Sequence, residues 1–241
     1  MSRILLLRAV PPEEEAASLP EGVDLLVTHE VASVPAGIEE ALAFDPARAR
    51  LAVTSRTTVR VLVAAGASQL FSRPFASVLA AGEGTARSLR EAGAGEVVVP
   101  ELPGAEGVVE ALRPYGVFLR LLWPRGADAD PRPFGDLGEG GAVVCAPVVY
   151  DKTPSKALDE ALLSRLSSGG HAAVAVASLA ALDVLLAALA SRGLPVPPVR
   201  WGALGPATAR AFASRGLPEP AVPGRARLDA LLDLLRNEVN R

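Results

Sequence analysis

The sequence feature that most constrains the fold is an internal repeat. When the chain is shifted by 123 residues, Leu51–Pro100 aligns with Val174–Pro223 without a gap, and 19 of the 50 aligned positions are identical. Among the matches, Gly82-x-x-Thr85-Ala86-Arg87 aligns with Gly205-x-x-Thr208-Ala209-Arg210. The high content of Ala, Val and Gly raises chance matching, but not to this level at one ungapped offset. The repeat therefore predicts two similar units that arose by duplication.

Short apolar runs separated by amphipathic helical patterns predict the architecture of each unit. Continuous apolar strands that alternate with helices are typical of parallel α/β sheets covered by helices on both faces. Ten such runs fit two five-stranded sheets better than one sheet. The candidate strands are Ile4–Leu7, Leu25–Val27, Leu51–Val53, Val78–Ala81, Val97–Val99, Phe118–Leu122, Val143–Ala146, Val174–Val176, Val199–Leu204 and Ala221–Val222.

The composition excludes several classes of protein. Half of the 241 residues are apolar, which is enough for a real core. The single cysteine, Cys145, excludes a disulfide scaffold, and His29 and His171 are too far apart for the spacing of a zinc site, so we expect no metal. A net charge of −3 gives no general attraction to nucleic acid or to an anionic membrane. Nearly all basic groups are arginines, because Lys152 and Lys156 are the only lysines.

The apolar segments indicate neither a signal peptide nor a membrane span. Ile4–Leu7 is too short for the apolar part of a signal peptide. Ala172–Leu189 is long enough to cross a bilayer, but it contains Ser178 and Asp183 and changes from a strand pattern to a helix pattern. A buried strand followed by a packed helix explains it better, so we expect a soluble, cytoplasmic protein with no membrane partner.

Four turns at equivalent places in the two units carry a small hydroxylated residue between a strand and a helix. They contain Thr54-Ser55, Gly84-Thr85, Ser178 and Thr208. Helix capping alone explains any one of these residues. Open α/β sheets, however, bind ligands at the carboxyl ends of their strands, and helix N-termini attract anions. Four such turns together predict a site for a large ligand with several negative groups.

Arginines near strand ends strengthen this interpretation. Arg8 ends the first candidate strand, and Arg125 follows Phe118–Leu122 in Trp123-Pro124-Arg125-Gly126. These two are the better candidates for ligand binding, because strand ends face the ligand in such folds. Arg87 and Arg210 lie one turn into their helices, where solvent or nearby acids explain them equally well.

Tyr150 is the candidate for acid–base chemistry. It is one of two tyrosines and ends the apolar run Val143–Val149; we expect Tyr150–Pro154 to lack regular structure, as a crossing between the units would. The residues alone favour a packing tyrosine at an interface with its hydroxyl in water. No dinucleotide fingerprint, P-loop or nucleophile elbow is present in the sequence.

The order and spacing of these motifs resemble the uroporphyrinogen-III synthase family over nearly the whole chain. The residues that carry the resemblance are Leu5-Leu6-Leu7-Arg8, Val53-Thr54-Ser55, Gly82-Glu83-Gly84-Thr85-Ala86-Arg87, Pro124-Arg125-Gly126, Val148-Val149-Tyr150-Asp151-Lys152-Thr153, Gly205-Pro206-Ala207-Thr208-Ala209-Arg210 and the apolar helix Leu228–Leu235.

The resemblance implies two flavodoxin-like parallel-sheet domains joined by a two-segment extended hinge, with the active site in the cleft between them. One domain would contain residues 1–30 and 151–241, and the other residues 35–147. The crossings would then lie at 31–34 and 148–150.

The activity implied by the resemblance is closure of the linear tetrapyrrole hydroxymethylbilane to uroporphyrinogen III, with inversion of ring D and loss of water. No cofactor is needed, and we expect a monomer. The substrate carries acetate and propionate groups on its pyrroles, in agreement with the anion-binding turns. Tyr150 matches the family's tyrosine that assists departure of the hydroxyl. The alternatives are a non-catalytic two-lobed binding or sensing domain for an anionic small molecule and a two-lobed transferase.

Overall fold

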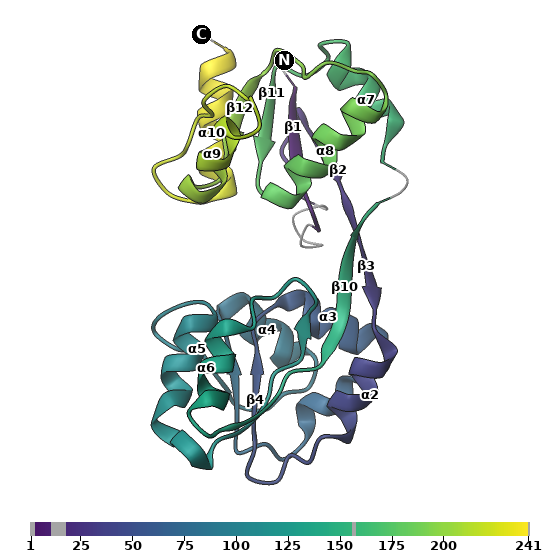
Figure 1. Ribbon diagram of the computed structural model, residues 1–241. Helices are drawn as coiled ribbons and strands as arrows, with labels where there is room; N and C mark the ends of the chain where they lie inside the picture. Colours follow the sequence, from purple (N-terminus) through teal and green to yellow (C-terminus); the bar gives the residue numbers. More distant parts are fainter. Residues whose placement is uncertain (1–2, 11–17, 156–157, 241) are drawn as a thin grey trace. The chain divides into compact units, whose positions relative to one another are not determined.

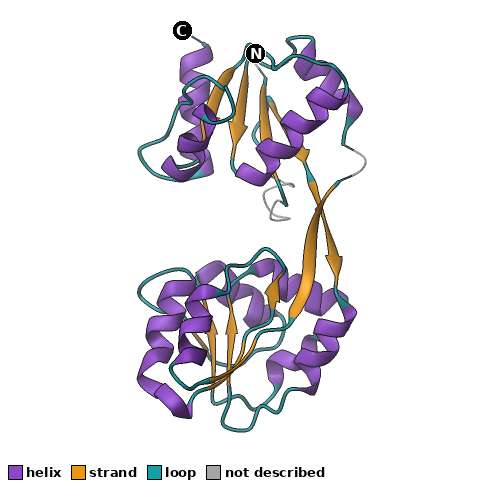
Figure 2. Ribbon diagram, viewed as in Figure 1, coloured by secondary structure: helices purple, strands orange, loops and turns teal. Residues whose placement is uncertain are grey.

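The computed structural model describes residues 3–10, 18–155 and 158–240. Met1 and Arg241, the outer limits of the expected first domain, lie outside the described residues, and so does Lys156. The chain is a mixed α/β protein with parallel sheets (Figures 1 and 2). It divides into two compact units. Unit 1 contains Met1–Glu30 and Thr153–Arg241, and unit 2 contains Val31–Lys152.

Unit 2 is built on a parallel five-stranded sheet in the order β6-β5-β4-β7-β9. Its strands are β4 (Arg50–Val53), β5 (Ser77–Ala80), β6 (Val97–Val98), β7 (Arg120–Leu122) and β9 (Val143–Cys145). Its helices are α2 (Pro35–Ala43), α3 (Arg56–Ala64), α4 (Glu83–Glu91), α5 (Ala105–Leu112) and α6 (Arg132–Glu139), with 3-10 turns η1 (Ser68–Ser72) and η2 (Arg113–Phe118).

Helices cover both faces of this sheet, as the continuous apolar strands predict. Leu51 and Val53 of β4 pack with α2, α3 and α4 on one face, and Ala52 between them packs with α5 and α6 on the other. On the second face, Trp123 stacks on Phe134 with ring centroids 4.0 Å apart. The carboxyl ends of β4 and β5 are thereby held next to the N-termini of α3 and α4.

Unit 1 is built on a parallel four-stranded sheet in the order β12-β11-β1-β2. Its strands are β1 (Ile4–Arg8), β2 (Val23–Val27), β11 (Ala173–Val176) and β12 (Arg200–Ala203), and its helices are α7 (Glu160–Ser167), α8 (Leu179–Ser191), α9 (Pro206–Ala213) and α10 (Leu228–Val239). Leu5 and Leu7 pack with α7 and α8, whereas Ile4 and Leu6 pack with α10. The first strand is therefore central and buried on both faces.

The expectation of two five-stranded sheets is wrong for unit 1. Ala221 forms only an isolated bridge to Gly202, so the candidate strand Ala221–Val222 does not extend the described sheet. The expected strand Phe118–Leu122 is also too long. Phe118 belongs to η2 and is 88% exposed, because the backbone of Gly116 (φ +50°) breaks the chain direction before β7.

A third sheet, in the order β3-β10-β8, contains the two segments that lead from one unit to the other. Its strands are β3 (His29–Ser33), β8 (Arg125–Gly126) and β10 (Val148–Pro154). The expectation that Tyr150–Pro154 lacks regular structure is therefore wrong. Tyr150 also does not end the earlier strand: β9 stops at Cys145, and Tyr150 lies inside β10. Backbone pairing of β10 with its neighbours β3 and β8 stabilises this strand without the apolar alternation by which strands are recognised.

Within residues 3–10, 18–155 and 158–240, no helix is long and apolar enough to cross a membrane. The apolar stretch Ala172–Leu189 is divided between β11 and α8, which confirms the expected strand and packed helix.

Candidate functional site

Tyr150 is a buried residue of unit 2, with only 2% of its surface exposed. Its ring belongs to the core that β4 forms with α3. Its hydroxyl lies 3.5 Å from Ser55 Oγ, at the outer limit of a hydrogen bond. Lys152 Nζ lies 5.6 Å from the ring centroid and pairs with Asp128 at 2.9 Å. The structure thus places the phenol against the N-terminus of α3.

The hydroxyls of Thr54 and Ser55 are both held by neighbours. Ser55 is the N-cap of α3, and its Oγ accepts the Thr57 N–H at 3.1 Å. Thr54 Oγ1 accepts the indole N–H of Trp123 at 3.1 Å. These bonds fix the turn at the carboxyl end of β4, so that the free N–H groups of the helix N-terminus have a defined direction.

Gly84 and Thr85 lie in the first turn of α4, after the carboxyl end of β5. Thr85 is buried, and its N–H donates to Gly82 O at 3.1 Å. The N–H groups of Glu83 and Gly84 precede this bond, so they are the donors that the helix leaves for a ligand. The side chain of Arg56 lies across Gly84: a Cβ added there would be 3.6 Å from Arg56 Cδ.

Arg125 lies in β8, on the strand next to Tyr150. Its guanidinium carbon is 5.6 Å from the ring centroid of Trp123, and one terminal nitrogen donates to Gly126 O at 3.2 Å. Its Nε–H is buried and has no hydrogen-bond partner within the described residues. A buried donor without an acceptor costs about 1–3 kcal/mol, which an anionic ligand can offset.

The remaining candidates, Arg8, Ser178 and Thr208, belong to unit 1. They lie at the carboxyl ends of β1, β11 and β12, or in the helices that follow these strands. Ser178 is the N-cap of α8 but makes no side-chain capping bond. Thr208 lies in the first turn of α9, which Gly205 caps. The structure therefore groups these three within unit 1 and the other six candidates within unit 2.

Two further titratable groups named in the sequence analysis are His171 and Cys145. His171 is buried at the amino end of the unit 1 sheet, with Nε2 2.9 Å from Asp24 Oδ2. Burial lowers the pKa of His171, and Arg3, His171 and Arg165 hold the pKa of Asp24 far below its usual range. Burial, with Glu40 nearby, raises the pKa of the Cys145 thiol to about 11, which makes it a poor nucleophile.

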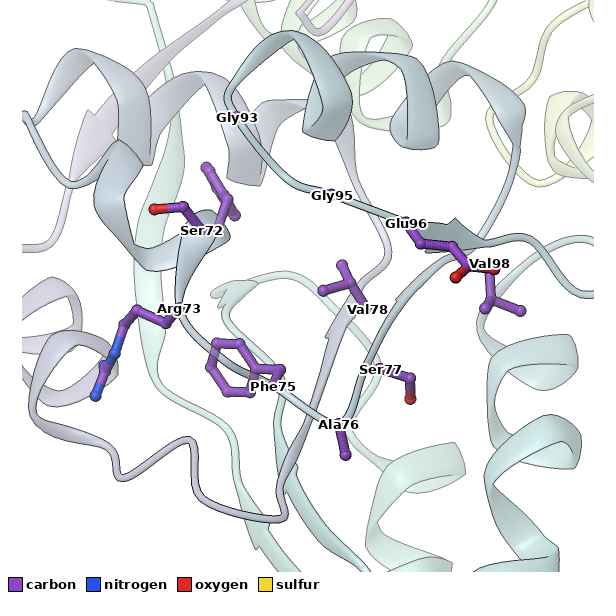
Figure 3. A pocket seen from close by; sticks show the side chains of 11 residues that line it. Ser72, Arg73, Phe75, Ala76, Ser77, Val78, Gly93, Gly95, Glu96 and Val98 are labelled. Carbon is purple, nitrogen blue, oxygen red and sulfur yellow. The ribbon is translucent and has the colours of Figure 1, made fainter.

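A cavity of about 570 Å³ opens at the opposite, amino end of β5 (Figure 3). Its lining residues come from η1, from the start of β5 and from the segment that leads into β6. It includes none of the nine candidate residues and, within the described parts of the chain, no buried polar side chain that lacks a partner. Among the described residues, no group of His, Cys, Asp or Glu side chains could hold a metal ion.

Sequence reasoning missed the importance of Trp123 and Gly126. The indole N–H of Trp123 donates a hydrogen bond to Thr54, and the backbone of Gly126 lies against the ring of Tyr150. In the sequence, the motif Trp123-Pro124-Arg125-Gly126 stands out for its arginine alone. A glycine in a strand is a sign that another group approaches the backbone closely, and this signal could have identified Gly126.

Comparison with known proteins gives a family match. The model of the family described as uroporphyrinogen-III synthase HemD matches residues 26–233. No curated protein matches the chain. Among solved structures, the uroporphyrinogen-III synthetase of Helicobacter pylori has a TM-score of 0.67 at 17% identity, covering 99% of this chain and 100% of that chain. A mutant uroporphyrinogen III synthase of the extremely thermophilic bacterium Thermus thermophilus has a TM-score of 0.58 at 21% identity, covering 99% of both chains.

Proposed function

The chain belongs to the uroporphyrinogen-III synthase family, and we propose that Tyr150 and the donors at the strand ends carry out the family's reaction. That reaction is the cyclisation of hydroxymethylbilane to uroporphyrinogen III, with inversion of ring D and loss of water. It makes the chain a cyclising hydro-lyase of tetrapyrrole biosynthesis.

The observation that carries the catalytic proposal is the place of the Tyr150 hydroxyl. It lies in unit 2 beside the N-terminus of α3, where Ser55 Oγ is 3.5 Å away. Because this hydrogen bond is long, the phenol can give its hydrogen to another acceptor at little cost. The hydroxyl that leaves ring A of the substrate is such an acceptor. Tyr150 would donate to this oxygen as the carbon–oxygen bond breaks, and the hydroxyl would depart as water.

The carboxylates of the substrate need donors, and each unit offers a set. In unit 2 these are Arg125, whose buried Nε–H has no partner in the described part of the chain, and the N-termini of α3 and α4. In unit 1 they are Arg8 and the N-termini of α8 and α9. Binding of the carboxylates would fold the linear tetrapyrrole so that ring D attacks through its substituted carbon, which is an orientation effect.

We also propose that the two units are flavodoxin-like domains that arose by duplication. At the offset of 123 residues, β4, α3, β5 and α4 correspond in order to β11, α8, β12 and α9. The expected domain boundaries, 1–30 with 151–241 and 35–147, are supported by the division of the chain after Glu30 and after Lys152. The crossings would be 31–34 and 148–150, within or beside β3 and β10.

We propose that the protein is a cytoplasmic monomer and does not bind nucleic acid. The net charge of −3 agrees with the last point, because it gives no general attraction to nucleic acid.

Product analysis tests the function. Freshly generated hydroxymethylbilane is supplied to the protein, the product is oxidised, and the type I and type III isomers are resolved. We expect the type III isomer, whereas heat-denatured protein should leave only the type I isomer of the uncatalysed closure. Type I product alone at high concentration of folded protein would overturn the proposal and favour a non-catalytic sensing domain.

A further inference from the structure

Gly126 and Tyr150 are opposite residues on the neighbouring parallel strands β8 and β10. The Ala127 N–H donates to Tyr150 O at 2.9 Å, and the Arg125 N–H donates to Pro147 O at 3.0 Å, so the two backbones are closely paired. The ring of Tyr150 lies over Gly126. A Cβ built on Gly126 would be 2.6 Å from Cζ of Tyr150, 2.7 Å from Cε2 and 2.7 Å from the hydroxyl oxygen. The space for a side chain at position 126 is therefore filled by the tip of Tyr150.

Space, rather than backbone conformation, is the reason for glycine at this position. Gly126 is not among the glycines with positive φ, so its backbone is open to any L-residue. The three nearest atoms to such a Cβ all belong to the end of one side chain. A methyl group at position 126 therefore cannot be accommodated unless the phenol moves.

We infer that Gly126 is a positioning residue for the Tyr150 hydroxyl. This inference rests on the proposed role of Tyr150 in the departure of the hydroxyl group. The bare backbone of Gly126 forms one side of the space that holds the phenol, and Ser55 Oγ, fixed by the Thr57 N–H, lies at the hydroxyl. Ordinary carbon contacts need about 3.5–4.0 Å, so a methyl group at 126 would move the phenol tip by about 1 Å. Misplacement of a reacting group by about 1 Å can reduce a rate by about a hundredfold.

Steady-state kinetics of Gly126→Ala test the inference. We expect kcat to fall by about 10–100-fold with little change in KM, because the hydroxyl moves while the carboxylate donors do not. The matched control is Gly95→Ala in the same unit, where an added Cβ meets nothing within 4 Å and φ is not positive. This control should retain normal kcat. The same Gly126→Ala change in a Tyr150→Phe background should have almost no further effect on kcat. An equal loss in both backgrounds would overturn the inference.

A spectroscopic measurement separates this inference from the proposed function. The chain has two tyrosines, so 3-fluorotyrosine gives two ¹⁹F resonances, and Tyr115→Phe identifies that of Tyr150. Gly126→Ala should shift the Tyr150 resonance, and Gly95→Ala should not. If Tyr150→Phe is fully active, the catalytic role of Tyr150 fails, while a shifted resonance still supports positioning by Gly126. An unshifted resonance overturns the positioning, whatever Tyr150 does.

A second variant covers the case in which Gly126→Ala does not fold. Tyr150→Leu removes the two ring carbons and the hydroxyl oxygen that the methyl group would meet. If the contact with Tyr150 is the reason for glycine, the double variant Gly126→Ala with Tyr150→Leu should fold as well as Tyr150→Leu alone. Unfolding of the double variant would show that something other than Tyr150 requires the glycine, and would overturn the inference.

Discussion

The turns before α3 in unit 2 and α8 in unit 1 occupy equivalent positions in the sequence repeat, but their contacts differ. Ser55 Oγ accepts the Thr57 N–H and lies 3.5 Å from the Tyr150 hydroxyl. Ser178 has the same extended N-cap backbone but makes no side-chain capping bond. In unit 2, Ser55 Oγ contacts both the N-terminus of α3 and the phenol of Tyr150, the candidate acid. In unit 1, the equivalent turn offers the main-chain N–H groups of α8. Equivalent sequence positions therefore do not have equivalent roles.

The residues that distinguish unit 2 come from outside the repeated segment. Tyr150 lies in β10, and Trp123 and Arg125 lie in or just before β8, beyond the repeated Leu51–Pro100. The repeated segments supply helix N-termini that can bind anions, and the candidate for proton donation is added by the third sheet. We therefore propose that both units bind the substrate and that unit 2 also supplies the proton donor.

Replacing Tyr150 by Phe should have the largest effect, and it tests directly whether unit 2 supplies the proton donor. It keeps the buried ring and removes only the phenolic donor. A positioned general acid contributes about 10²–10⁴-fold, so we expect kcat to fall within that range while substrate affinity changes little. Steady-state kinetics with isomer analysis measure both quantities.

The stability of the same variant is a control. A normal hydrogen bond contributes about 0.5–1.5 kcal/mol, and the bond to Ser55 is long, so the melting temperature should change little. Tyr115→Phe, at an exposed tyrosine of the same unit, should be normal in both assays. A normal kcat for Tyr150→Phe would leave substrate folding as the main catalytic device, and the two units would then have the same role.

Replacing Thr85 or Thr208 by Ala tests whether main-chain donors bind the carboxylates in both units. These residues are equivalent in the repeat and lie in the first turns of α4 and α9. Because the main-chain N–H groups survive the change, we expect activity to fall modestly, and by a similar factor in the two variants. A loss in kcat/KM above about a hundredfold, roughly 2.7 kcal/mol, would assign binding to the threonine side chains instead.

Paired alanine variants of Ser55 and Ser178 sharpen the comparison in terms of stability. Ser55→Ala removes a side-chain cap and should cost about 0.5–2 kcal/mol of unfolding free energy. Ser178→Ala removes no side-chain capping bond and should stay within about 0.5 kcal/mol. Each unit contains one of the two tryptophans, Trp123 in unit 2 and Trp201 in unit 1. Tryptophan fluorescence therefore reports the unfolding of both units in urea. Equal costs for the two serines would contradict the difference seen in the structure.

The smallest effect should be a pH dependence of unit 1. Burial lowers the pKa of His171 below its ordinary value of 6.5, so the unfolded chain takes up this proton at a higher pH than the folded chain does. The stability that neutral His171 provides is therefore present above about pH 6.5 and is lost as the pH falls toward the folded pKa. Thermal melts between about pH 7.5 and pH 5.5 should show this loss, and it should be weaker in His171→Gln. An unchanged pH profile in that variant would assign the loss to other groups.

Most of the fold could be predicted from the sequence because buried parallel strands are continuous apolar runs. Leu51–Val53 and Val174–Val176 lie within β4 and β11, where every side chain of these runs is buried. One prediction failed because a strand can form without apolar side chains to bury. Tyr150 is followed by the polar residues Asp151–Thr153, and this run forms a strand through backbone pairing within the sheet β3-β10-β8, which leaves no periodic pattern in the sequence.

The candidate site was predicted less completely than the fold. The strand-end rule made Ser55 and Arg125 candidates, because both follow apolar runs, and their role in binding stays a prediction. It could not show that Tyr150 is buried, since the sequence that follows is polar. It also could not show that Tyr150 contacts Gly126 on the neighbouring strand. Such contacts depend on register, and a short strand such as β8, with two residues, carries too few side chains to indicate it.

The pairing of β1 with β11 has a consequence for synthesis on the ribosome. Domains usually fold in the order in which they are made, but β1 is made before unit 2 and its partner β11 only after all of unit 2. Until β11 emerges, the apolar run Ile4–Leu7, which becomes a central strand, is without one of its two neighbours. A nascent chain with such an unpaired strand is prone to aggregate. A slow stretch of translation after Lys152 would prolong this exposure, whereas unit 2 could complete its fold during the pause.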